Sequence, residues 1–388
     1  MTSQIHPSSA NKIKELIKKA IINPEFTERF SQRNHEENVF YLIEKELNKR
    51  KIEFKIDYCS CLIIFENIKG DFCKDSDLVS DECVNKLAED IFTFYASTPI
   101  EYNVLFHFRQ LIDLSQLREF PSISLSVGRE STSFLLPDEY VEYAIVNVSA
   151  VGYYSGWYPE SFMKVVLQKL NVLLFLMEEN SIITRYPYKH SSQISSGLFK
   201  WAGIEMPRIE IINKNTEQKK VYPKLSDYIE KYYDNYSINE GAFSKLGLDN
   251  AFDVANSIIC DNSKESLRIK AAIDWLIYSR ITEDDTMSFI QICMGLEAIF
   301  GDDDYEGSLT TILSDRCAYL IGKNIKDRSD IKKMFREIYQ IRSKIIHGVR
   351  SYLSENDAVM LHMARSFLRK SILKELGNLG LLSPSQQR

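Results

Sequence analysis

The chain has 388 residues, of which 44% are hydrophobic and 26% are charged, and its formal net charge is −6. This length allows two or three domains, and the composition is typical of a globular protein. A negative net charge argues against a protein that coats nucleic acid over its whole surface. We therefore expect a globular chain of two domains, with any polyanion-binding surface confined to one part of it.

The first residues, MTSQIHPSSANKIKELIKK, lack the apolar core of a secretory signal, so no signal peptide is expected. The most apolar helix candidate, residues 165–177, is interrupted by Gln168, Lys169 and Asn171, which predicts a buried helix instead of a membrane span. Seven cysteines in such a chain predict free thiols in a reducing compartment. We expect a cytoplasmic protein with no membrane partner.

Four of the cysteines cluster in the first half of the chain, which raises the alternative of a zinc site. They are Cys59, Cys61, Cys73 and Cys83. Their spacing lacks the paired CxxC motifs of common zinc sites, and two of them lie in an apolar run. We therefore interpret these cysteines as buried free thiols. We expect neither a metal nor a cofactor.

Residues 1–240 mix the periods of helices and strands. Helices are predicted at 11–21, 36–50, 81–96 and 160–179. Alternating apolar and charged residues predict a strand at 52–58, with residues 62–65 as its hairpin partner. Further strands are predicted at 123–127 and 143–151. We expect an α+β domain over residues 1–240, with a sensing or regulatory role.

Strand signals vanish after residue 240, which predicts an all-α domain over residues 241–388. Helices are predicted at 248–260, 264–281, 286–300, 308–321, 328–347 and 354–376. Four of them are followed by a glycine, which closes helices in the left-handed conformation: Gly301, Gly322, Gly348 and Gly377. Helix starts are marked by Asp285, Ser308, Asp327 and Ser354, the last within a capping box. The fold class expected for the whole chain is α+β, a mixed domain followed by a helical bundle.

The helix predicted at 328–347 carries Arg342 on the face that should be apolar. The residues that recur with it at intervals of three or four are Ile331, Phe335, Ile338 and Ile345. An unpaired guanidinium on that face would be costly to desolvate, so Arg342 needs an anion or an open groove. His347 ends the same helix, about 140° around the axis from Arg342. An arginine and a histidine bordering one groove can bind a phosphodiester and move protons around it.

The same helix lies in a basic segment. Residues 316–350 contain ten Lys or Arg and three Asp or Glu, a net charge of +7 that leaves −13 for the rest of the chain. A local basic patch on an acidic protein suits a confined anionic ligand. A solvated helix face remains the alternative. The spacing of Arg342 and His347 alone does not separate a structural arginine from an active site, because Arg-x4-His is common.

Three segments occur in an order and separation that closely resemble the Apea-like branch of the HEPN superfamily. They are FIQICMGLEAIFG (289–301), LTTILSDRCAYLIG (309–322) and IYQIRSKIIHG (338–348). The resemblance covers roughly residues 260–380 and includes the Arg-x4-His signature of that superfamily. It implies a metal-independent endoribonuclease of a toxin, abortive-infection or antiviral system, with Arg342 and His347 as the catalytic residues.

The resemblance also implies partners. HEPN active sites are composite, with one Arg-His motif from each protomer, so we expect RNA as substrate and a homodimer formed through the C-terminal bundle. His347 would act as general acid or base, and Arg342 would hold the phosphate while the RNA 2′-hydroxyl attacks it. An antitoxin or a phage-derived trigger is a possible further partner. HEPN toxins silenced by a nucleotidyltransferase carry a tyrosine two residues after the histidine, where this chain has Val349.

Four other residues of the bundle are supporting or RNA-binding candidates. Glu297 could orient Arg342 or His347, with a structural salt bridge as the alternative. Arg316 could contact RNA, although an ion pair between helices is preferred. Ser343 and Lys344 are candidate phosphate contacts, or else surface residues that favour solubility.

The remaining candidates are weaker. His362 is expected to be a packed core histidine, and the aspartates at 302–304 a solvated loop. Two aromatic-rich segments, VGYYSGWYP (151–159) and DYIEKYYDNY (227–236), could bind a ligand through exposed rings or belong to the core. The function class that competes with the nuclease is a binding module that holds RNA or nucleotide without cutting it.

Overall fold

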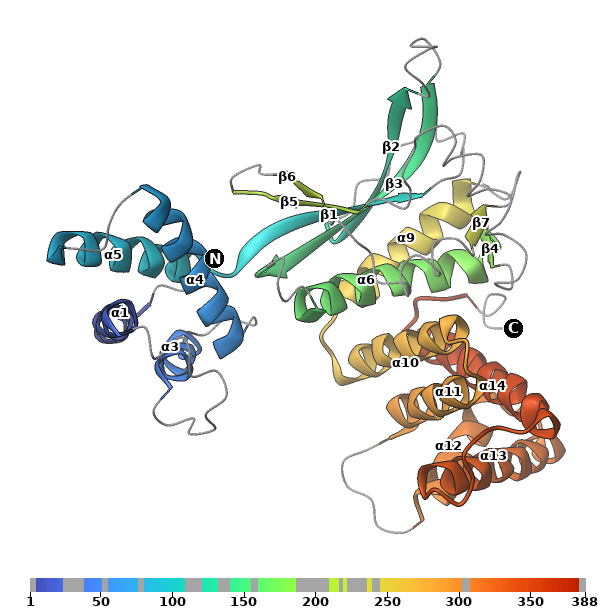
Figure 1. Cartoon of the computed structure of the whole chain (residues 1–388). Coiled ribbons are helices and arrows are strands. Elements are labelled where there is room, and N and C mark those ends of the chain that lie inside the picture. The colour runs from blue at the N-terminus through green and yellow to red at the C-terminus, as the bar shows by residue number, and fades with distance from the viewer. Residues whose placement is uncertain are drawn as a thin grey trace. The chain divides into compact units, whose positions relative to one another are not determined.

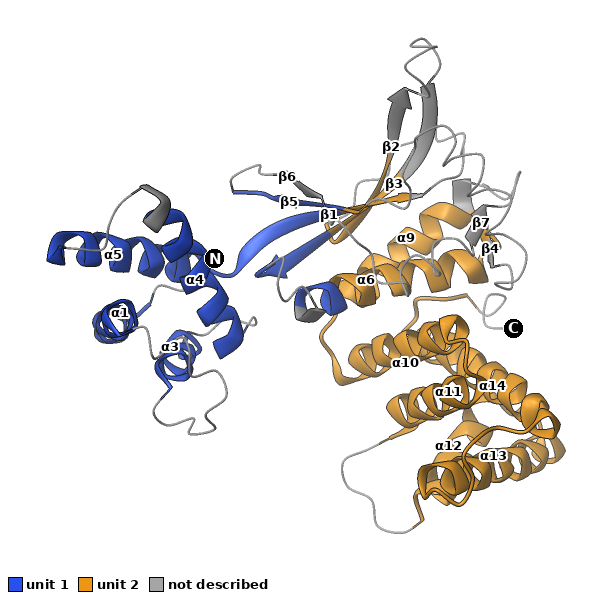
Figure 2. Cartoon of the chain, in the orientation of Figure 1, with its two compact units in different colours: residues 1–104, 149–165, 210–222 blue, residues 105–148, 166–209, 223–388 orange. Residues whose placement is uncertain are grey.

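The computed structural model describes twelve stretches of the chain: 5–23, 38–50, 55–75, 80–108, 121–131, 140–154, 160–185, 209–215, 219–221, 236–238, 245–301 and 308–383. Both helices and antiparallel strands are present, which confirms the α+β class (Figure 1). The chain divides into two compact units (Figure 2). Unit 1 comprises residues 1–104, 149–165 and 210–222, and unit 2 comprises residues 105–148, 166–209 and 223–388.

The described residues of unit 1 include four helices that pack around one apolar core. They are α1 (Pro7–Ile22), α3 (Val39–Leu47), α4 (Tyr58–Asp75) and α5 (Asp81–Ser97). The largest fully buried side chains of this core include Phe40, Phe65 and Tyr95. The hydroxyl of Tyr95 donates a hydrogen bond to the Cys61 carbonyl at 2.6 Å, so this buried polar group is satisfied.

Helix α4 corrects the hairpin predicted for residues 52–65. Residues 55–57 are not in a strand, and residues 62–65 lie inside α4. The Asp57 carboxylate accepts a hydrogen bond from the Ser60 amide at 2.8 Å, as an N-terminal cap does. Cys61, Leu62, Ile64 and Phe65 are all buried in the core of unit 1. An apolar run too short to show a helical period was therefore mistaken for a strand, although Asp57 marked a helix start.

In the described part of the chain, seven strands make two sheets. The larger sheet has the order β2-β3-β1-β5-β6 and the smaller pairs β4 with β7. The strands are β1 (Ile100–Phe108), β2 (Ile123–Ser131), β3 (Tyr140–Gly152), β4 (Ile183–Arg185), β5 (Ile209–Asn213), β6 (Lys219–Val221) and β7 (Tyr236–Ile238). The β2–β3 pair is antiparallel, with Ile123 opposite Val148. The strands predicted at 123–127 and 143–151 are thus confirmed.

Helix α6 (Glu160–Glu179) has the predicted bounds and is tied to the C-terminal helices by polar contacts. Glu178 pairs with Arg280, and Glu179 pairs with Arg369. The side-chain amides of Gln168 and Asn171 both donate hydrogen bonds to Asp274, at 2.7 and 2.8 Å. From Val166 to Met177 most side chains of α6 are buried. This apolar helix is buried as predicted, and its charged end faces partners on two other helices.

The C-terminal part of unit 2 is helical, and no strand follows residue 240 within the described ranges. Its helices are α9 (Lys245–Cys260), α10 (Lys264–Ile281), α11 (Asp285–Phe300), α12 (Leu309–Ile321), α13 (Ile325–Ile346), the short 3-10 helix η1 (Glu355–Asp357) and α14 (Ala358–Asn378). Helix α11 packs against α10, α12, α13 and α14. At Gly295 an added Cβ would lie 2.5 Å from Leu368 Cδ2 and 3.1 Å from Trp275 Cβ, so glycine permits this close approach.

The ends of these helices only partly follow the glycine rule. Gly348 has φ +69°, the left-handed conformation that was predicted. Gly301 and Gly322 instead have extended backbones with φ −66° and −79°, and Gly377 lies inside α14. The residue with positive φ after α14 is Gly380. Glycine marks a helix end in the sequence, but the path of the following chain decides which conformation it takes.

Across the described residues we find no helix that combines the length and the apolar character required to cross a bilayer.

Candidate functional site

Helix α13 places Arg342 on the same face as its buried residues. Ile331, Phe335, Ile338 and Tyr339 are buried on this face, and the rings of Phe335 and Tyr339 stack at 4.9 Å. The side chain of Arg342 retains 27% exposure. The stripe predicted from the sequence is confirmed in its main part, and Arg342 lies at the solvent-facing end of it.

Arg342 has a carboxylate partner on the neighbouring helix. One guanidinium nitrogen lies 3.0 Å from a carboxylate oxygen of Glu297 on α11, whose side chain is 28% exposed. This ion pair supplies the anion that an arginine on an apolar face requires. The contact of Glu297 is with Arg342, and it fits both an orienting role and a structural salt bridge.

Two weakly acidic groups lie beneath this ion pair. The Tyr339 hydroxyl donates a hydrogen bond to the Cys293 carbonyl at 3.3 Å. Burial raises the pKa of the Cys293 thiol, and the Glu297 carboxylate adds to the rise. Burial likewise raises the pKa of Tyr339 well above its usual range. Both groups stay protonated near neutral pH, so the charges at this place are those of Arg342 and Glu297.

His347 lies at the other side of the helix. It is the C-terminal cap of α13, and its side chain is exposed. Five residues of helix separate it from Arg342 by about 140° around the axis and about 7.5 Å along it. By this helix geometry, the two side chains of one chain project from different sides of α13. Gly348 follows with φ +69°, and its open surroundings would accept a Cβ without contact.

The turn after His347 is fixed by a small network. Arg350 pairs with Asp357, which also accepts the Ser354 hydroxyl in the capping box that the sequence predicted. The amide of Leu353 donates to the Thr286 hydroxyl at 2.9 Å, which anchors the turn to the start of α11. Burial tends to raise the pKa of Asp357, but the bonds from Ser354 and Arg350 lower it below its usual value. His347 is therefore exposed beside an ordered turn.

The basic segment separates into two groups. Five of its cations contact neighbouring parts of the bundle: Arg316, Arg328, Lys332, Arg342 and Arg350. The other five are exposed: Lys323, Lys326, Lys333, Arg336 and Lys344. Four of these, Lys326, Lys333, Arg336 and Lys344, lie with His347 within an arc of about 80° around the axis of α13. Together they extend over about 32 Å along the helix. We call these five residues (Lys326, Lys333, Arg336, Lys344 and His347) the basic face of α13.

The other candidates take different places. Arg316 donates a hydrogen bond to the Phe300 carbonyl at the end of α11, so it contacts the terminus of a neighbouring helix. Ser343 and Lys344 are exposed. His362 is exposed as well, which corrects the expected core position, because its side of α14 faces solvent.

Several sequence predictions fall wholly or partly outside the described residues. The aspartates at 302–304 and residues 155–159 of the first aromatic segment lie outside them, as does all of the second segment except Tyr236. Of the four clustered cysteines, Cys61 is buried as predicted, Cys59 and Cys83 are only half-buried, and the side chain of Cys73 is not among those described. Within the described part of the chain, no group of three or more His, Cys, Asp and Glu side chains is placed to hold a metal ion.

Comparisons with protein-family models, with curated proteins and with solved structures found no match. The geometry of the bundle and the sequence resemblance are thus the grounds on which a function is proposed.

Proposed function

We propose that the C-terminal helices form a HEPN-type bundle and that the protein is a metal-independent endoribonuclease. The observation that carries the proposal is the pair of Arg342 and Glu297 on the helix that ends at the exposed His347. The Glu297 carboxylate lies beside the guanidinium, and the exposed part of Arg342 remains accessible to a phosphate oxygen. The proposal joins this arrangement to the sequence resemblance.

The chemistry follows from the two side chains. His347 takes the proton from the RNA 2′-hydroxyl or gives one to the leaving oxygen, and Arg342 stabilises the charge that develops on the phosphate. Because the nucleophile is the substrate's own hydroxyl, a metal-bound water is not required. The products are a cyclic phosphate end and a 5′-hydroxyl, and DNA is inert.

The basic face of α13 supports RNA as the ligand. Lys326, Lys333, Arg336 and Lys344 are exposed, and this row of positive charge ends at His347. Cations in a row track a phosphate backbone and raise its local concentration. Ser343 is exposed beside Lys344 and is a further candidate contact.

The working unit that we propose is a homodimer through the bundle. Arg342 and His347 of one chain lie on different sides of α13, so a second copy supplies the complementary group across a two-fold axis. Large apolar side chains are exposed close to His347 in the sequence (Ile346, Val349 and Tyr352) and near the starts of α11 and α14 (Met287 and Val359). Their burial between two copies would stabilise such an interface.

The test is cleavage of single-stranded RNA in EDTA by the full chain. We expect His347→Ala and Arg342→Ala each to lower the rate by at least about 100-fold, as loss of general acid-base or charge stabilisation does. His362→Ala is the matched control, because His362 is also exposed on a bundle helix, and it should cut as the wild type does. Equal cutting by all variants would reject the catalytic assignment.

The composite site has its own test. Mixtures of Arg342→Ala and His347→Ala protein should regain part of the activity after subunit exchange. A strict monomer that still cuts RNA would reject the dimer. The role as an antiviral, abortive-infection or toxin effector in the cytoplasm, with an antitoxin or a phage-derived trigger, rests on the resemblance.

A binding module without catalysis is the second candidate. The observation that favours it is that Glu297 already neutralises Arg342 within the chain. Fluorescence anisotropy with labelled RNA separates the two functions. A module binds RNA, loses affinity when Lys333 and Lys344 are changed to glutamine, and leaves the RNA intact.

A further inference from the structure

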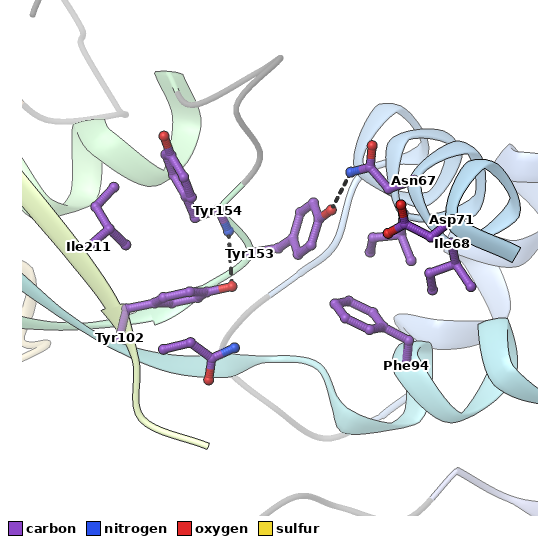
Figure 3. Close-up of a pocket in the computed structure, with 10 residues that line it drawn as sticks. Asn67, Ile68, Asp71, Phe94, Tyr102, Tyr153, Tyr154 and Ile211 are labelled. Atoms are coloured by element: carbon purple, nitrogen blue, oxygen red, sulfur yellow. Dashed lines mark hydrogen bonds between the residues drawn. The ribbon is translucent and has the colours of Figure 1, made fainter. Parts of the chain in front are cut away.

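A cavity of about 360 Å³ lies within unit 1, between α4 and α5 on one side and β1, β5 and the end of β3 on the other (Figure 3). Its volume is within the range of small-molecule sites. The residues that line it come from α4, α5, β1, β5 and the chain just after β3. All of them belong to unit 1, so the cavity is separate from the proposed nuclease site on α13.

Aromatic rings line this space from both sides. Phe94 comes from α5 and Tyr102 from β1, and Figure 3 shows the two side chains on opposite sides of the cavity. The rings of Phe94 and Tyr153 meet edge to face, with centroids 5.9 Å apart and planes at 88°. Ile64 and Ile211 add apolar surface. Walls of this kind suit a flat ring, which stacks on aromatic neighbours or packs against their edges.

Two tyrosine hydroxyls of the wall have protons left to donate. The Tyr154 amide donates to the Tyr102 hydroxyl at 3.4 Å, and the Asn67 side-chain amide donates to the Tyr153 hydroxyl at 3.4 Å. In both bonds the tyrosine oxygen accepts, and within the described ranges neither hydroxyl donates a bond of its own. Burial raises the pKa of Tyr102 to about 12 and also raises that of Tyr153, so both protons are present at neutral pH. Tyr102 is only 6% exposed, and a donor that is so deeply buried requires an acceptor.

The other polar groups that line the cavity include two uncharged amides, Asn67 and Asn213. The Asn213 side-chain oxygen accepts the Asn215 amide at 2.8 Å, which leaves the side-chain nitrogen as a donor. Asp71 also lines the cavity, but it is exposed and already has an interaction partner, so it does not select the charge of a ligand. A charged group would be desolvated here against rings and neutral dipoles, at a cost in free energy that a neutral polar ligand avoids.

We propose that this cavity binds a free, uncharged, planar heteroaromatic ring of the nucleobase type. The ring packs among Phe94, Tyr102 and Tyr153, and its carbonyl or ring-nitrogen acceptors receive the two tyrosine protons. The amides of Asn67 and Asn213 bond to its remaining polar groups. A hydrocarbon ring of the same size would pack as well but would leave both hydroxyls without an acceptor, so the wall selects for the heteroatoms. The described lining residues include no cation for a phosphate, which favours a free ring over a nucleotide.

The test is calorimetric binding to the full chain with hypoxanthine and with indole, which has a similar pair of fused rings without the carbonyl and ring-nitrogen acceptors. Hypoxanthine should bind at least about ten-fold more tightly, because only it accepts the tyrosine protons. Tyr102→Phe and Tyr153→Phe keep the rings, and each should weaken hypoxanthine about five- to ten-fold while the affinity for indole stays unchanged. Tyr58→Phe is the matched control, because it removes a hydroxyl from α4 outside the cavity, and it should bind both probes as the wild type does.

Phe94→Leu removes a ring instead of a hydroxyl and should weaken both probes, which separates ring packing from hydrogen bonding. Circular dichroism of each variant checks that the helices of unit 1 are retained, and Tyr153→Phe decides the test if Tyr102→Phe does not fold. Equal affinity for the two probes, absence of hypoxanthine binding, or full binding by the Tyr→Phe variants overturns the proposal. Displacement of hypoxanthine by a short single-stranded RNA also overturns it, because the cavity would then hold a base of a strand.

Discussion

Arg342 and Glu297 form an ion pair between α13 and α11, with 3.0 Å between the nearest nitrogen and oxygen and about a quarter of each side chain exposed. The pair explains how a guanidinium can lie on the apolar face of a helix. It also joins the candidate catalytic arginine to the centre of the bundle, since α11 packs against four other helices. A change at Glu297 should therefore alter both stability and the position of Arg342.

We expect a double-mutant cycle of Arg342→Gln and Glu297→Gln to give a coupling free energy of about 1 kcal/mol, as for a partly buried pair. Urea unfolding of the four proteins measures it. The pair of Lys332 and Asp315, at 2.8 Å and more exposed, is the control and should give about 0.5 kcal/mol or less. Strictly additive effects at Arg342 and Glu297 would show that the ion pair does not form in solution.

Asp274 should make the protein less stable as the pH rises. Burial raises the pKa of Asp274 to about 6, although the bonds from Asn171 and Gln168 oppose the shift. The folded chain thus holds this proton more tightly than the unfolded chain, whose carboxyl has a pKa of about 4. The free energy of unfolding falls by up to about 3 kcal/mol as the pH rises from about 4 to 6, and it stays at the lower value above that range.

Asp274→Asn removes the ionisation, so we expect a flatter stability profile between about pH 4 and 6. Chemical denaturation at several pH values measures the slope. Asp253→Asn changes an exposed acid on α9 and is the control. Its stability should change with pH with the same slope as that of the wild type. An unchanged slope in Asp274→Asn would contradict the assignment.

Glu46 in unit 1 should have the opposite effect to Asp274, because it makes the protein more stable as the pH rises. Its side chain is 2% exposed, and burial tends to raise its pKa. Hydrogen bonds from Lys12, Lys49 and Ser9 outweigh burial and lower the pKa from 4.5 to about 2. This stabilisation is complete above about pH 5 and is lost as the pH falls toward 2.

Glu46→Gln should destabilise unit 1 by about 3 kcal/mol near neutral pH, because the charged hydrogen bonds are lost. Glu15→Gln is the matched control, since Glu15 is 75% exposed and pairs with Lys18 on the same helix surface. It should change stability by less than about 0.5 kcal/mol. Thermal unfolding followed by circular dichroism compares the two, and equal midpoints would refute the prediction.

Two glycines of the bundle should respond differently to alanine. Gly295→Ala places a Cβ 2.5 Å from Leu368 Cδ2, so overpacking between α11 and α14 should cost about 1–3 kcal/mol. Gly348→Ala meets no atom within 4 Å, and its cost comes from φ +69° alone, about 1 kcal/mol. Urea unfolding gives both values. A larger loss at Gly348 than at Gly295 would contradict this order.

The helices were predictable where the sequence marks their ends. The bounds 160–179 of α6 and 264–281 of α10 coincide with the structure, and the box at Ser354 is present. Helix α4 was missed, because its apolar run hides the helical period and its cap at Asp57 was overlooked. Helices are predicted from local apolar and polar patterns, and these patterns are lost where a helix is buried on several sides.

The candidate site was predictable only along one helix. The stripe of α13 pointed to Arg342 and to the need for an anion, but not to which of several carboxylates would supply it. Tyr339 and Cys293 were missed, since nothing in the sequence pairs α13 with α11. The cavity of unit 1 was beyond reach for the same reason, apart from the tyrosines at 153–154, which the aromatic segment had marked.

The contacts of α6 bear on how the chain can be divided. A fragment that begins at residue 241 would leave Arg280 without Glu178, Arg369 without Glu179, and Asp274 without the amides of α6. It would also remove a helix whose apolar side chains are buried in the whole protein. The cooperative folding unit is therefore discontinuous in sequence, and the bundle is best produced with α6 joined to it or supplied in trans.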